Sequence, residues 1–580
     1  MAVDLPLPAK LVLLSVPEAL LVKHFVPDQD LRVPITPIVL LLAAINFCVW
    51  AFYRVLIYPF FVSPFRHLPG PVPKYPIIAN GPVVMARPPG GEFLNWVKTI
   101  PNDGLIRFRG FFNVDRIIPT HPRTIADVLV HNSYDFEKPA RLRSFLRRIL
   151  GDGLIMVEGD EHRFQRKNIM PSFSFRHVKD LYPVFWAKAV ALTDAVAAEA
   201  QDDPVVEINH WSTKVTLDII GLAALGRDFH ALKKSDDPLV ATYEEVLEPT
   251  REKTAFFALH MLGLERVVRI LPWRINEVMR DTTTQLKQIC QQLLADKKAA
   301  SKTEGEEQPK DILSVMMRSN LFGDDMLIDQ LLTFLAAGHE TTSSAFTWAC
   351  YLLAVHPAAQ SRLRAEVLQA NLSSSSSPDH LPSSSSSLAD KLEAGMPYLN
   401  GVCNETTRLY PTVPVTLRDA VRDTRVGGQR VPRGTQVLLS PWAVNRSPAL
   451  WGADAESFRP ERWIDDDEDD DDDEADPPLE TGGGGGGGGG RGRGRGGGRG
   501  PRTNNHGGAS SNYCLLTFLH GPRSCIGQRF AQAELRALVA AFVGRFEWTL
   551  AMDERDVVPA GVVTTKPMNG MRLRVRGYKA

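Results

Sequence analysis

A run of nineteen residues without a charge constrains the fold of this 580-residue chain more than any other feature. The run, Ile35 to Tyr53, reads ITPIVLLLAAINFCVWAFY, and a helix of about 20 apolar residues is long enough to cross a bilayer. Arg54 follows at once, and Trp50 and Tyr58 carry the amphipathic rings that are enriched at membrane interfaces. A secretory signal peptide starts earlier and has a shorter apolar core. The sequence therefore predicts a transmembrane anchor over residues 35–62.

The segments on either side of this anchor have different characters. Residues 1–34 form an N-terminal segment whose stretch LVLLSVPEALLV contains Pro17 and Glu18, which favours an interfacial or amphipathic position over a crossing. Residues 63–84 are rich in proline, which cannot sustain a helix and favours a stiff extended strap. Basic residues on the body side, such as Arg66, indicate that this side faces the cytosol. We expect a single crossing, and whether residues 11–26 also enter the membrane stays open.

Residues 85–580 have the composition of one globular domain. Hydrophobic residues make up 44% of the chain and charged residues 23%, which excludes wholesale disorder. Stretches such as YPVFWAKAVALTDAVAAEA repeat apolar residues at three and four positions, and strand-like pieces such as MRLRVRG are short. The six cysteines show no CxxC pair, which argues against a zinc site or a disulfide framework. The pattern predicts a mainly α domain with small β-sheets.

Two low-complexity insertions interrupt this domain, and we predict both to be disordered. Residues 371–388 contain two serine runs, and residues 464–512 contain an acidic block followed by glycine and arginine. Twelve acids and five arginines lie from Asp465 to Arg502, so the remaining chain has 61 basic against 55 acidic residues. An arginine–glycine box that binds RNA is one reading of Arg491 to Arg499. We favour a surface insertion and expect no nucleic acid, because the adjacent acids compete for those arginines.

One cysteine near the C-terminus lies in a setting suited to a metal ligand. The stretch runs from Phe518 through Gly521, Arg523 and Cys525 to Gly527, and the two glycines allow the backbone to turn tightly around the sulfur. A good helical sequence, QRFAQAELRALVAAF, follows. The free N–H groups at its start favour a thiolate, and thiolates bind metals.

This stretch resembles the haem-binding loop of the cytochrome P-450 family, with the pattern FxxGxRxCxG. All five fixed positions match, and a chance match in a chain of this length has a probability on the order of 10⁻⁴. The resemblance implies the cytochrome P-450 fold, with haem b between a central helix and the cysteine loop. It also implies that Cys525 is the axial ligand of the haem iron, with Phe518, Gly521, Arg523 and Gly527 around the cofactor.

A second stretch resembles the family's central helix signature. It runs from Ala337 to Thr342 and reads AGHETT. Gly338 removes a side chain where a flat cofactor has to approach, and Glu340 and Thr341 supply an acid and a hydroxyl for proton delivery. The resemblance makes Glu340 and Thr341 the candidate catalytic residues. His339 occupies the variable position of the signature, where we expect a solvent-facing or core histidine and not an iron ligand.

The remaining motifs concern a structural network and the haem carboxylates. Glu405 and Arg408 match the family's ExxR, and Arg462 lies in FRPERW, which is similar to its FxPERW. The resemblance implies a buried network of these three residues that is structural and not catalytic. Four residues are candidates to bind the haem propionates: Arg523, Arg166, His162 and Arg418. His162 stands where the family often has tryptophan, and surface solvation stays open for His162 and Arg418.

The resemblance implies a haem-thiolate monooxygenase that uses O₂ and electrons from a separate reductase. The partner would be NADPH–cytochrome P-450 reductase at the endoplasmic reticulum membrane, with cytochrome b5 as a second donor. Stretches such as Leu331 to Thr341, which the family uses for substrate contact, are mostly apolar or small. We expect a lipophilic substrate, from secondary metabolism first and a fatty acid or alkane second.

Two further classes stay open at this point. A related isomerase or dehydratase would rearrange a peroxide without external electrons, but such relatives tend to lose the threonine or alter the cysteine loop. A membrane haem protein or RNA-binding protein without turnover is the non-enzymatic alternative.

Overall fold

The computed structural model describes residues 7–25, 34–233, 251–261, 263–264, 268, 270–303, 311–370, 372, 385–465, 502–561 and 563–578. Most of the serine-rich insertion and residues 466–501 of the acidic-glycine insertion, including Arg491 to Arg499, lie outside these residues.

The described chain is mainly helical, which confirms the predicted fold class. The long helices are amphipathic or, at the centre, apolar on all sides, as expected for helices that share one core. The main helices are α1 (Leu7–Phe25), α2 (Ile35–Phe52), α3 (Gly91–Thr99), α4 (Pro122–Ala126), α5 (Ala140–Leu150), α6 (Gly159–Ile169), α7 (Phe175–Asp180), α8 (Tyr182–Asp202), α9 (Ile208–Ile220), α11 (Arg251–Met261), α13 (Arg274–Thr303), α14 (Ile312–Arg318), α15 (Asp324–Val355), α16 (Pro357–Gln369), α17 (Ser385–Glu393), α18 (Pro397–Leu409), α19 (Pro441–Val444), α20 (Pro448–Trp451) and α21 (Gln528–Arg545).

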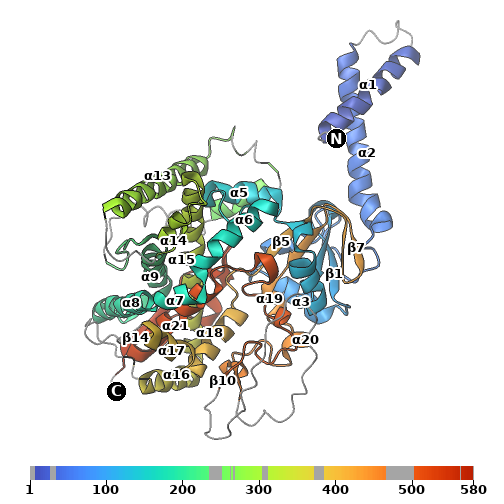
Figure 1. Ribbon diagram of the computed structural model, residues 1–580. Helices are drawn as coiled ribbons and strands as arrows, with labels where there is room; N and C mark the ends of the chain where they lie inside the picture. The colour runs from blue at the N-terminus through green and yellow to red at the C-terminus, as the bar shows by residue number, and fades with distance from the viewer. Residues whose placement is uncertain are drawn as a thin grey trace, which may run out of the picture.

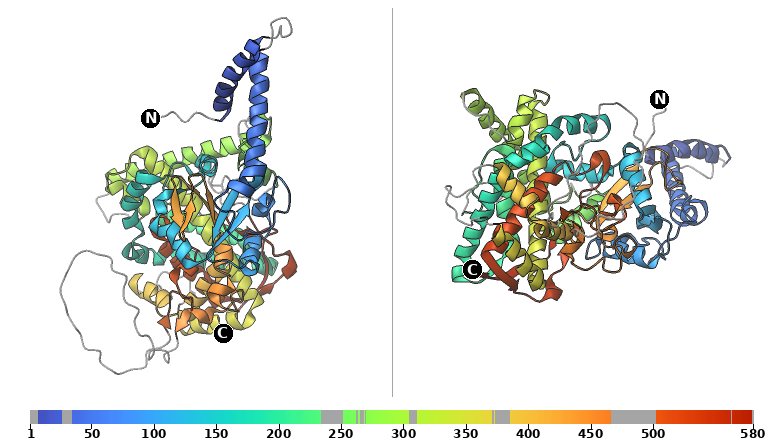
Figure 2. Two further views of the ribbon diagram at one scale, coloured as in Figure 1. Left: turned by 90° about the vertical axis from the view of Figure 1, so that its right-hand side faces the viewer. Right: turned by 60° about the horizontal axis from the view of Figure 1, so that its bottom comes forward.

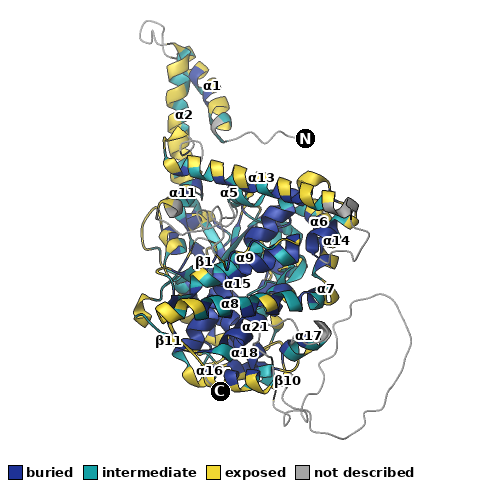
Figure 3. Cartoon of the chain, turned by 90° about the vertical axis from the view of Figure 1, so that its left-hand side faces the viewer, coloured by how far each residue is buried: buried dark blue, intermediate teal, exposed yellow. Residues whose placement is uncertain are grey.

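Helix α15 is the centre of the larger, helical half of the body. Its 32 residues are buried along most of their length, and α9 packs along it while α21 packs against α8 (Figures 1 and 3). Phe346 and Trp348 of α15 are fully buried, and the Phe346 ring meets Phe542 of α21 edge to face at 5.6 Å. A long helix that is apolar on all sides has to lie inside a core. This burial fixes the positions of Ala337 to Thr342 relative to α21 and the loop before it.

The smaller half of the body is built around a five-stranded sheet (Figure 1). Its strand order is β1 (Leu105–Arg109), β2 (Asp115–Pro119), β8 (Gln436–Leu439), β5 (Thr416–Ala420) and β3 (Phe136–Glu137), with β2 and β8 parallel and the other pairs antiparallel. A three-stranded sheet joins β11 (Phe546–Leu550), β14 (Arg572–Gly577) and β4 (Val205–Glu207). Two-stranded ladders pair β6 (Thr424–Val426) with β7 (Gln429–Val431) and β12 (Pro559–Ala560) with β13 (Lys566–Pro567).

The N-terminal helices stand away from this body (Figure 2). Helix α2 continues into the π-helix Tyr53–Val62, and the two together form the one helix among the described residues that is long and apolar enough to cross a membrane. Its most apolar window has a mean hydropathy of 2.2 and is not buried in the protein. This helix coincides with the predicted anchor 35–62. Helix α1 packs beside α2, which the sequence did not predict.

The ends of the acidic-glycine insertion are joined to each other. Strand β9 (Ile464–Asp465) pairs antiparallel with β10 (Arg502–Thr503). The Asn504 side chain donates to the Asp465 carboxylate over 2.7 Å, and Ala509 is buried beside Trp463 in a small cluster. The described part of the predicted insertion 464–512 is therefore attached to the body.

Candidate active site

The backbone holds the Cys525 loop in one shape. The Cys525 N–H donates to the Phe518 carbonyl over 2.8 Å. Gly521 has φ 72°, and a Cβ there would lie 2.1 Å from the Leu129 carbonyl oxygen, so a side chain is excluded. Gly527 has an ordinary φ of −88° and immediately precedes α21. The loop therefore presents the sulfur at the N-terminus of α21, as the sequence predicted.

The surroundings of Cys525 act on its protonation in opposite directions. Burial raises the pKa of the thiol, while the Gly527 N–H and the Arg166 cation lower it. The Cys525 side chain is accessible to solvent although protein surrounds it, so it faces an internal space. Arg166 of α6 donates to the Ser524 carbonyl over 2.7 Å and to the Ser524 hydroxyl over 3.0 Å. Arg166 thus fixes the residue before the cysteine, a contact that the sequence did not predict.

The two candidate proton-handling residues lie on α15. The Thr341 hydroxyl donates to the Ala337 carbonyl over 2.7 Å, one helical turn earlier. The Glu340 carboxylate accepts from the Thr564 hydroxyl over 2.8 Å and lies 3.7 Å from the Lys566 Nζ. The Glu340 and Lys566 side chains are only 14% and 11% exposed. A C-terminal turn more than 200 residues away therefore holds the acid in place.

Gly338 allows a close approach of helices. A Cβ at Gly338 would lie 2.7 Å from the Ile220 Cδ1, so the missing side chain lets α9 pack against α15. The Thr216 hydroxyl of α9 donates to the His339 carbonyl over 3.0 Å. The His339 ring is fully buried, and its Nδ1 lies 2.6 Å from the Leu335 carbonyl. Burial lowers the pKa of His339 to about 4, so this residue is a neutral core histidine.

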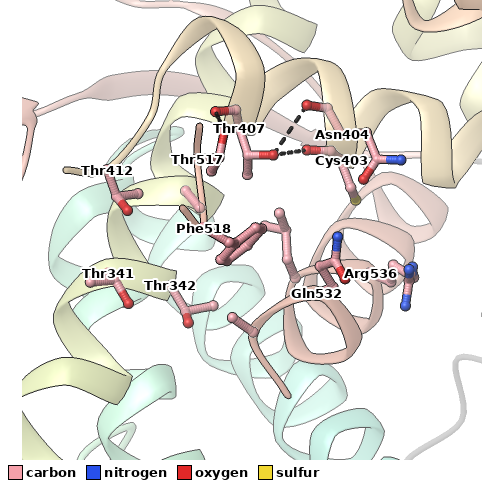
Figure 4. Close-up of a pocket in the computed structure, with 13 residues that line it drawn as sticks. Thr341, Thr342, Cys403, Asn404, Thr407, Thr412, Thr517, Phe518, Gln532 and Arg536 are labelled. Carbon is pink, nitrogen blue, oxygen red and sulfur yellow. Dashed lines mark hydrogen bonds between the residues drawn. The ribbon is translucent and has the colours of Figure 1, made fainter. Parts of the chain in front are cut away.

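A pocket lies between α15, α18, α21 and the cysteine loop (Figure 4). The Phe518 ring lies near its centre, with Thr341 and Thr342 on one side and Asn404 and Thr407 on the other. The Thr517 hydroxyl donates to the Thr407 carbonyl over 2.8 Å, which ties the loop to α18. The Phe518 side chain therefore lies between the backbone of the cysteine loop and the central helix α15.

Cations gather beside the cysteine loop. Arg523 forms an ion pair with Glu158 over 2.5 Å, and both side chains are 5% exposed. Lys138 is enclosed near Arg418, Glu158 and Arg523, and burial followed by repulsion from Arg418 lowers its pKa to about 7. Burial, then Arg523, lowers the pKa of Arg418 to about 10. Burial, followed by repulsion from Arg523, Lys138 and Arg166, lowers the pKa of His162 to about 4. Lys138, Arg418 and Arg523 thus lie around a single acid, Glu158, and the lowered pKa values of Lys138 and Arg418 mark a site suited to further negative charge.

His162 and Arg418 are both buried, so surface solvation does not apply to either residue. The His162 Nδ1 lies 3.5 Å from the Tyr134 hydroxyl. Arg418 donates to the Leu417 carbonyl over 2.8 Å and to the Thr416 hydroxyl over 3.0 Å.

The structure brings Glu405, Arg408 and Arg462 together in a buried network. Arg408 binds the Glu405 carboxylate through two nitrogens, over 2.7 and 2.8 Å, and Arg462 donates to the same carboxylate over 3.1 Å. The Trp463 indole N–H and the Arg459 backbone N–H add two more hydrogen bonds, over 2.9 and 3.1 Å. Glu405 and Arg408 are fully buried. Five donors satisfy this buried carboxylate, and Arg408 would lose its counter-charge without it.

Arg408 also carries this network to the chain that precedes the cysteine loop. Its guanidinium donates to the Asn445 and Ala455 carbonyls over 2.6 Å each. The Asn445 side chain in turn accepts from the Leu516 N–H over 2.8 Å. Arg408 and Asn445 thus connect the network to Leu516, which lies just before the cysteine loop.

Comparison with known proteins identifies the family. The family model of cytochrome P-450 matches residues 111–571, which include the cysteine loop, α15 and the Glu405 network. The chain belongs to the cytochrome P-450 family. The resemblance predicted from the motifs is confirmed, and the family implies a haem-iron cofactor.

Fungal cytochromes P-450 are similar to nearly the whole chain. Cytochrome P-450 monooxygenase sphH of Aspergillus fumigatus is 40% identical over 526 residues, covering 90% of this chain and 89% of the relative. Cytochrome P-450 monooxygenase ptmK of Penicillium ochrochloron is 36% identical over 542 residues, covering 91% and 96%. Cytochrome P-450 monooxygenase buaD of Petromyces alliaceus is 35% identical over 577 residues, covering 96% of both chains.

The residues present fit a haem. Cys525 offers one thiolate from an internal face, and no group of three or more His, Cys, Asp or Glu in the described chain could hold a metal by itself. The excess positive charge of Lys138, Arg418 and Arg523 fits the two carboxylates of a haem. The residues that would hold the group are therefore Cys525 at the metal and this cation cluster at its edge.

Sequence reasoning missed several residues of the site. Lys138 and Glu158 belong to no motif, although both lie in a segment rich in basic residues. Thr564 and Lys566 lie near the C-terminus, and their link to Glu340 spans more than 220 positions. Trp463 is the last residue of the FRPERW motif, and its position there could have indicated a hydrogen-bond donor for Glu405.

The low pKa of Lys138 gives a first testable prediction. Its pKa of about 7 without haem rises when two carboxylates bind nearby, so haem uptake above pH 7 also takes up a proton. We expect haem affinity to lose up to about tenfold per pH unit above pH 7 through this residue. Equilibrium competition for haem with an apoglobin, from pH 7 to 9, measures the slope.

Lys138→Met should remove this contribution, so that the slope of log affinity against pH becomes more positive by up to about one, whereas Lys74→Met, on the exposed strap, should leave the slope unchanged. The Cys525 thiol titrates in the opposite direction, and it does so equally in all three proteins. Equal slopes in wild type and Lys138→Met would contradict the assignment.

Proposed function

We propose that the chain is a haem-thiolate monooxygenase that inserts an oxygen atom from O₂ into a lipophilic small molecule, with Cys525 as the axial ligand of haem b. The observation that carries this proposal is the pocket that Thr341 of α15 shares with Phe518 of the cysteine loop, together with the cation cluster beside that loop. The relatives sphH, ptmK and buaD are all named as monooxygenases, which supports this reaction over an isomerisation or dehydration.

In this proposal the chain's own residues bind, orient and deliver protons. When bound, the haem iron supplies O₂ activation and oxygen transfer. The cation cluster at Lys138, Arg418 and Arg523 orients the haem by its carboxylates. Thr341 and Glu340 hold a proton route on the face of α15, and Thr564 and Lys566 keep the Glu340 carboxylate from turning away.

We further propose that the electrons come from NADPH–cytochrome P-450 reductase, with cytochrome b5 as a second donor. The body outside the acidic tract has a net charge of +6, which suits a donor with an acidic docking face. The predicted anchor supports attachment to the endoplasmic reticulum membrane with the catalytic domain in the cytosol. Secondary metabolism is the substrate class that we propose, and the fungal source of the relatives supports it.

The experiment that tests this function is a reconstitution of the purified holoprotein with the reductase. Lipophilic metabolites that shift the haem Soret band on titration would be incubated with NADPH under ¹⁸O₂. We expect one ¹⁸O atom in the product and a strict dependence on NADPH. Product formed without NADPH, or without ¹⁸O, would instead indicate an isomerase or dehydratase.

Thr341→Ala separates proton delivery from haem binding. Haem content and substrate affinity should stay close to wild type, because a small hydroxyl contributes little to either. Product formation should fall by about 10²-fold, the low end for a positioned proton donor, while NADPH is still consumed and hydrogen peroxide accumulates. The ratio of product to NADPH measures this loss. Glu340→Gln should slow the same step.

Thr342→Ala is the matched control. Thr342 is buried, and its hydroxyl interacts with Glu534 of α21, whose pKa burial raises well above the ordinary range. Its loss should leave the product ratio nearly unchanged. An unchanged ratio in Thr341→Ala, with a reduced one in Thr342→Ala, would assign the proton route to Thr342.

A further inference from the structure

Asn46 is a polar side chain in the middle of the predicted membrane span, and its partners are on another helix. Its amide donates to the Glu18 carboxylate over 2.7 Å and to the Ser15 hydroxyl over 3.1 Å. Both partners belong to α1. Ser15 and Ala19 are fully buried, so small residues of α1 form the contact with α2.

The position of Asn46 fixes the depth of these partners. Asn46 follows the first residue of α2 by eleven positions, about 16 Å along the helix, so a spanning α2 places its amide inside the hydrocarbon. Hydrocarbon offers no hydrogen bonds, and a polar group there has to pair within the protein. Because Ser15 and Glu18 are those partners, α1 has to lie at the same depth.

The outer surface of α1 suits lipid. Large apolar side chains on it are exposed: Val12, Leu13, Leu14, Val16, Leu20, Leu21 and Phe25. By composition α1 does not qualify as a spanning helix on its own, but its 19 residues extend about 28 Å, close to the hydrocarbon thickness of about 30 Å. Lys10 and Lys23 lie near its two ends, where long cationic side chains reach the interface. Glu18, the acid between them, is the residue that Asn46 pairs with.

We propose that α1 and α2 enter the bilayer together as a helical hairpin, with acyl chains covering the outer faces of both helices. The first turn of α1 then lies on the same side of the membrane as the catalytic body. Figure 2 shows α1 running back along α2 in this sense. This arrangement replaces the single crossing expected from the sequence, and it depends on the membrane anchoring proposed above.

An N-glycosylation acceptor reports which side of the membrane a segment occupies. One full-length protein carries the acceptor in a spacer before Met1, and a second carries it in a spacer between Asp30 and Leu31. Both proteins are expressed in microsomes. A glycan is detected as a change in gel mobility when an endoglycosidase removes it. We expect modification between Asp30 and Leu31 and none before Met1. Modification at both places would overturn the hairpin in favour of a single crossing. Modification at neither place would overturn it as well, because α2 would not cross.

A pair of leucine variants tests the polar contact. Asn46→Leu leaves Glu18 without its partner, so α1 should leave the bilayer and the tag before Met1 should become modified in at least half of the molecules. Cys48→Leu changes an exposed side chain two residues on and should leave the tag unmodified. An unmodified tag in Asn46→Leu would overturn the role of the pair. Carbonate extraction of the same microsomes reports membrane anchoring, and their carbon monoxide spectrum reports haem binding. A failure of the proposed haem-thiolate function can therefore be distinguished from a failure of the hairpin.

Discussion

Cys525→Ala should abolish the spectrum of a thiolate-ligated haem. Reduced wild-type protein with carbon monoxide should absorb as a thiolate–haem complex, because Cys525 is presented by a loop that its neighbours hold rigidly. Alanine offers no ligand, so we expect complete loss of this band and loss of NADPH-dependent product below detection. Cys525→Ser should also lose the band, since a hydroxyl is a poor substitute for a thiolate.

Cys350→Ala and Cys403→Ala are the matched controls. Both cysteines are buried, and burial raises the pKa of both thiols. They behave as small core residues, and their replacement should keep both the band and the activity. A thiolate spectrum that persists in Cys525→Ala, or disappears in either control, would refute the axial assignment.

Glu405→Gln should have the next largest effect. The amide keeps the shape of the side chain but leaves Arg408 buried without its counter-charge, while Arg462 retains Asp454 at 3.2 Å. Removing one partner of a buried ion pair costs about 3–5 kcal/mol of stability. We expect little holoprotein at growth temperature and a large drop in the urea midpoint of haem release for the protein that can be isolated.

Glu461→Gln provides the comparison within the same PERW segment. Glu461 pairs with Arg362 over 2.6 Å, but both side chains are about half exposed. Loss of such a surface pair costs about 0–1 kcal/mol. Equal holoprotein yields for Glu405→Gln and Glu461→Gln would show that the buried network does not support the fold.

The sequence could predict those parts of the site that depend on short spacings. Glu405 and Arg408 lie one helical turn apart, and Cys525 lies within a ten-residue pattern, so each is readable without a fold. Lys138 beside Arg418, and Lys566 beside Glu340, are instead brought together by packing between distant elements. Contacts between such distant residues leave no periodic pattern in the sequence. Gly338 shows a related limit, since its close neighbour is Ile220 of α9, which only the structure shows.

The anchor and the insertion show the same distinction. Hydropathy predicted the extent of α2 with its π-helical continuation, because length and composition decide whether a helix crosses a membrane. The pairing of α1 with α2 depends on a hydrogen bond across two helices and has no such signal. Likewise, composition marks where low complexity begins, but the pairing of β9 with β10 follows from backbone hydrogen bonds that any residues can make.

The β9–β10 pair makes this point of the chain a natural grafting site. Because the two strands bond to each other, the chain enters and leaves the body at one fixed place, whatever lies between Asp465 and Arg502. Doubling the length of a closed loop costs only about 0.6 kcal/mol in entropy. Evolution can therefore lengthen or shorten this tract at little cost to the catalytic body. Protein engineers could use the same junction to fuse an electron-donor module or a fluorescent reporter in the middle of the enzyme.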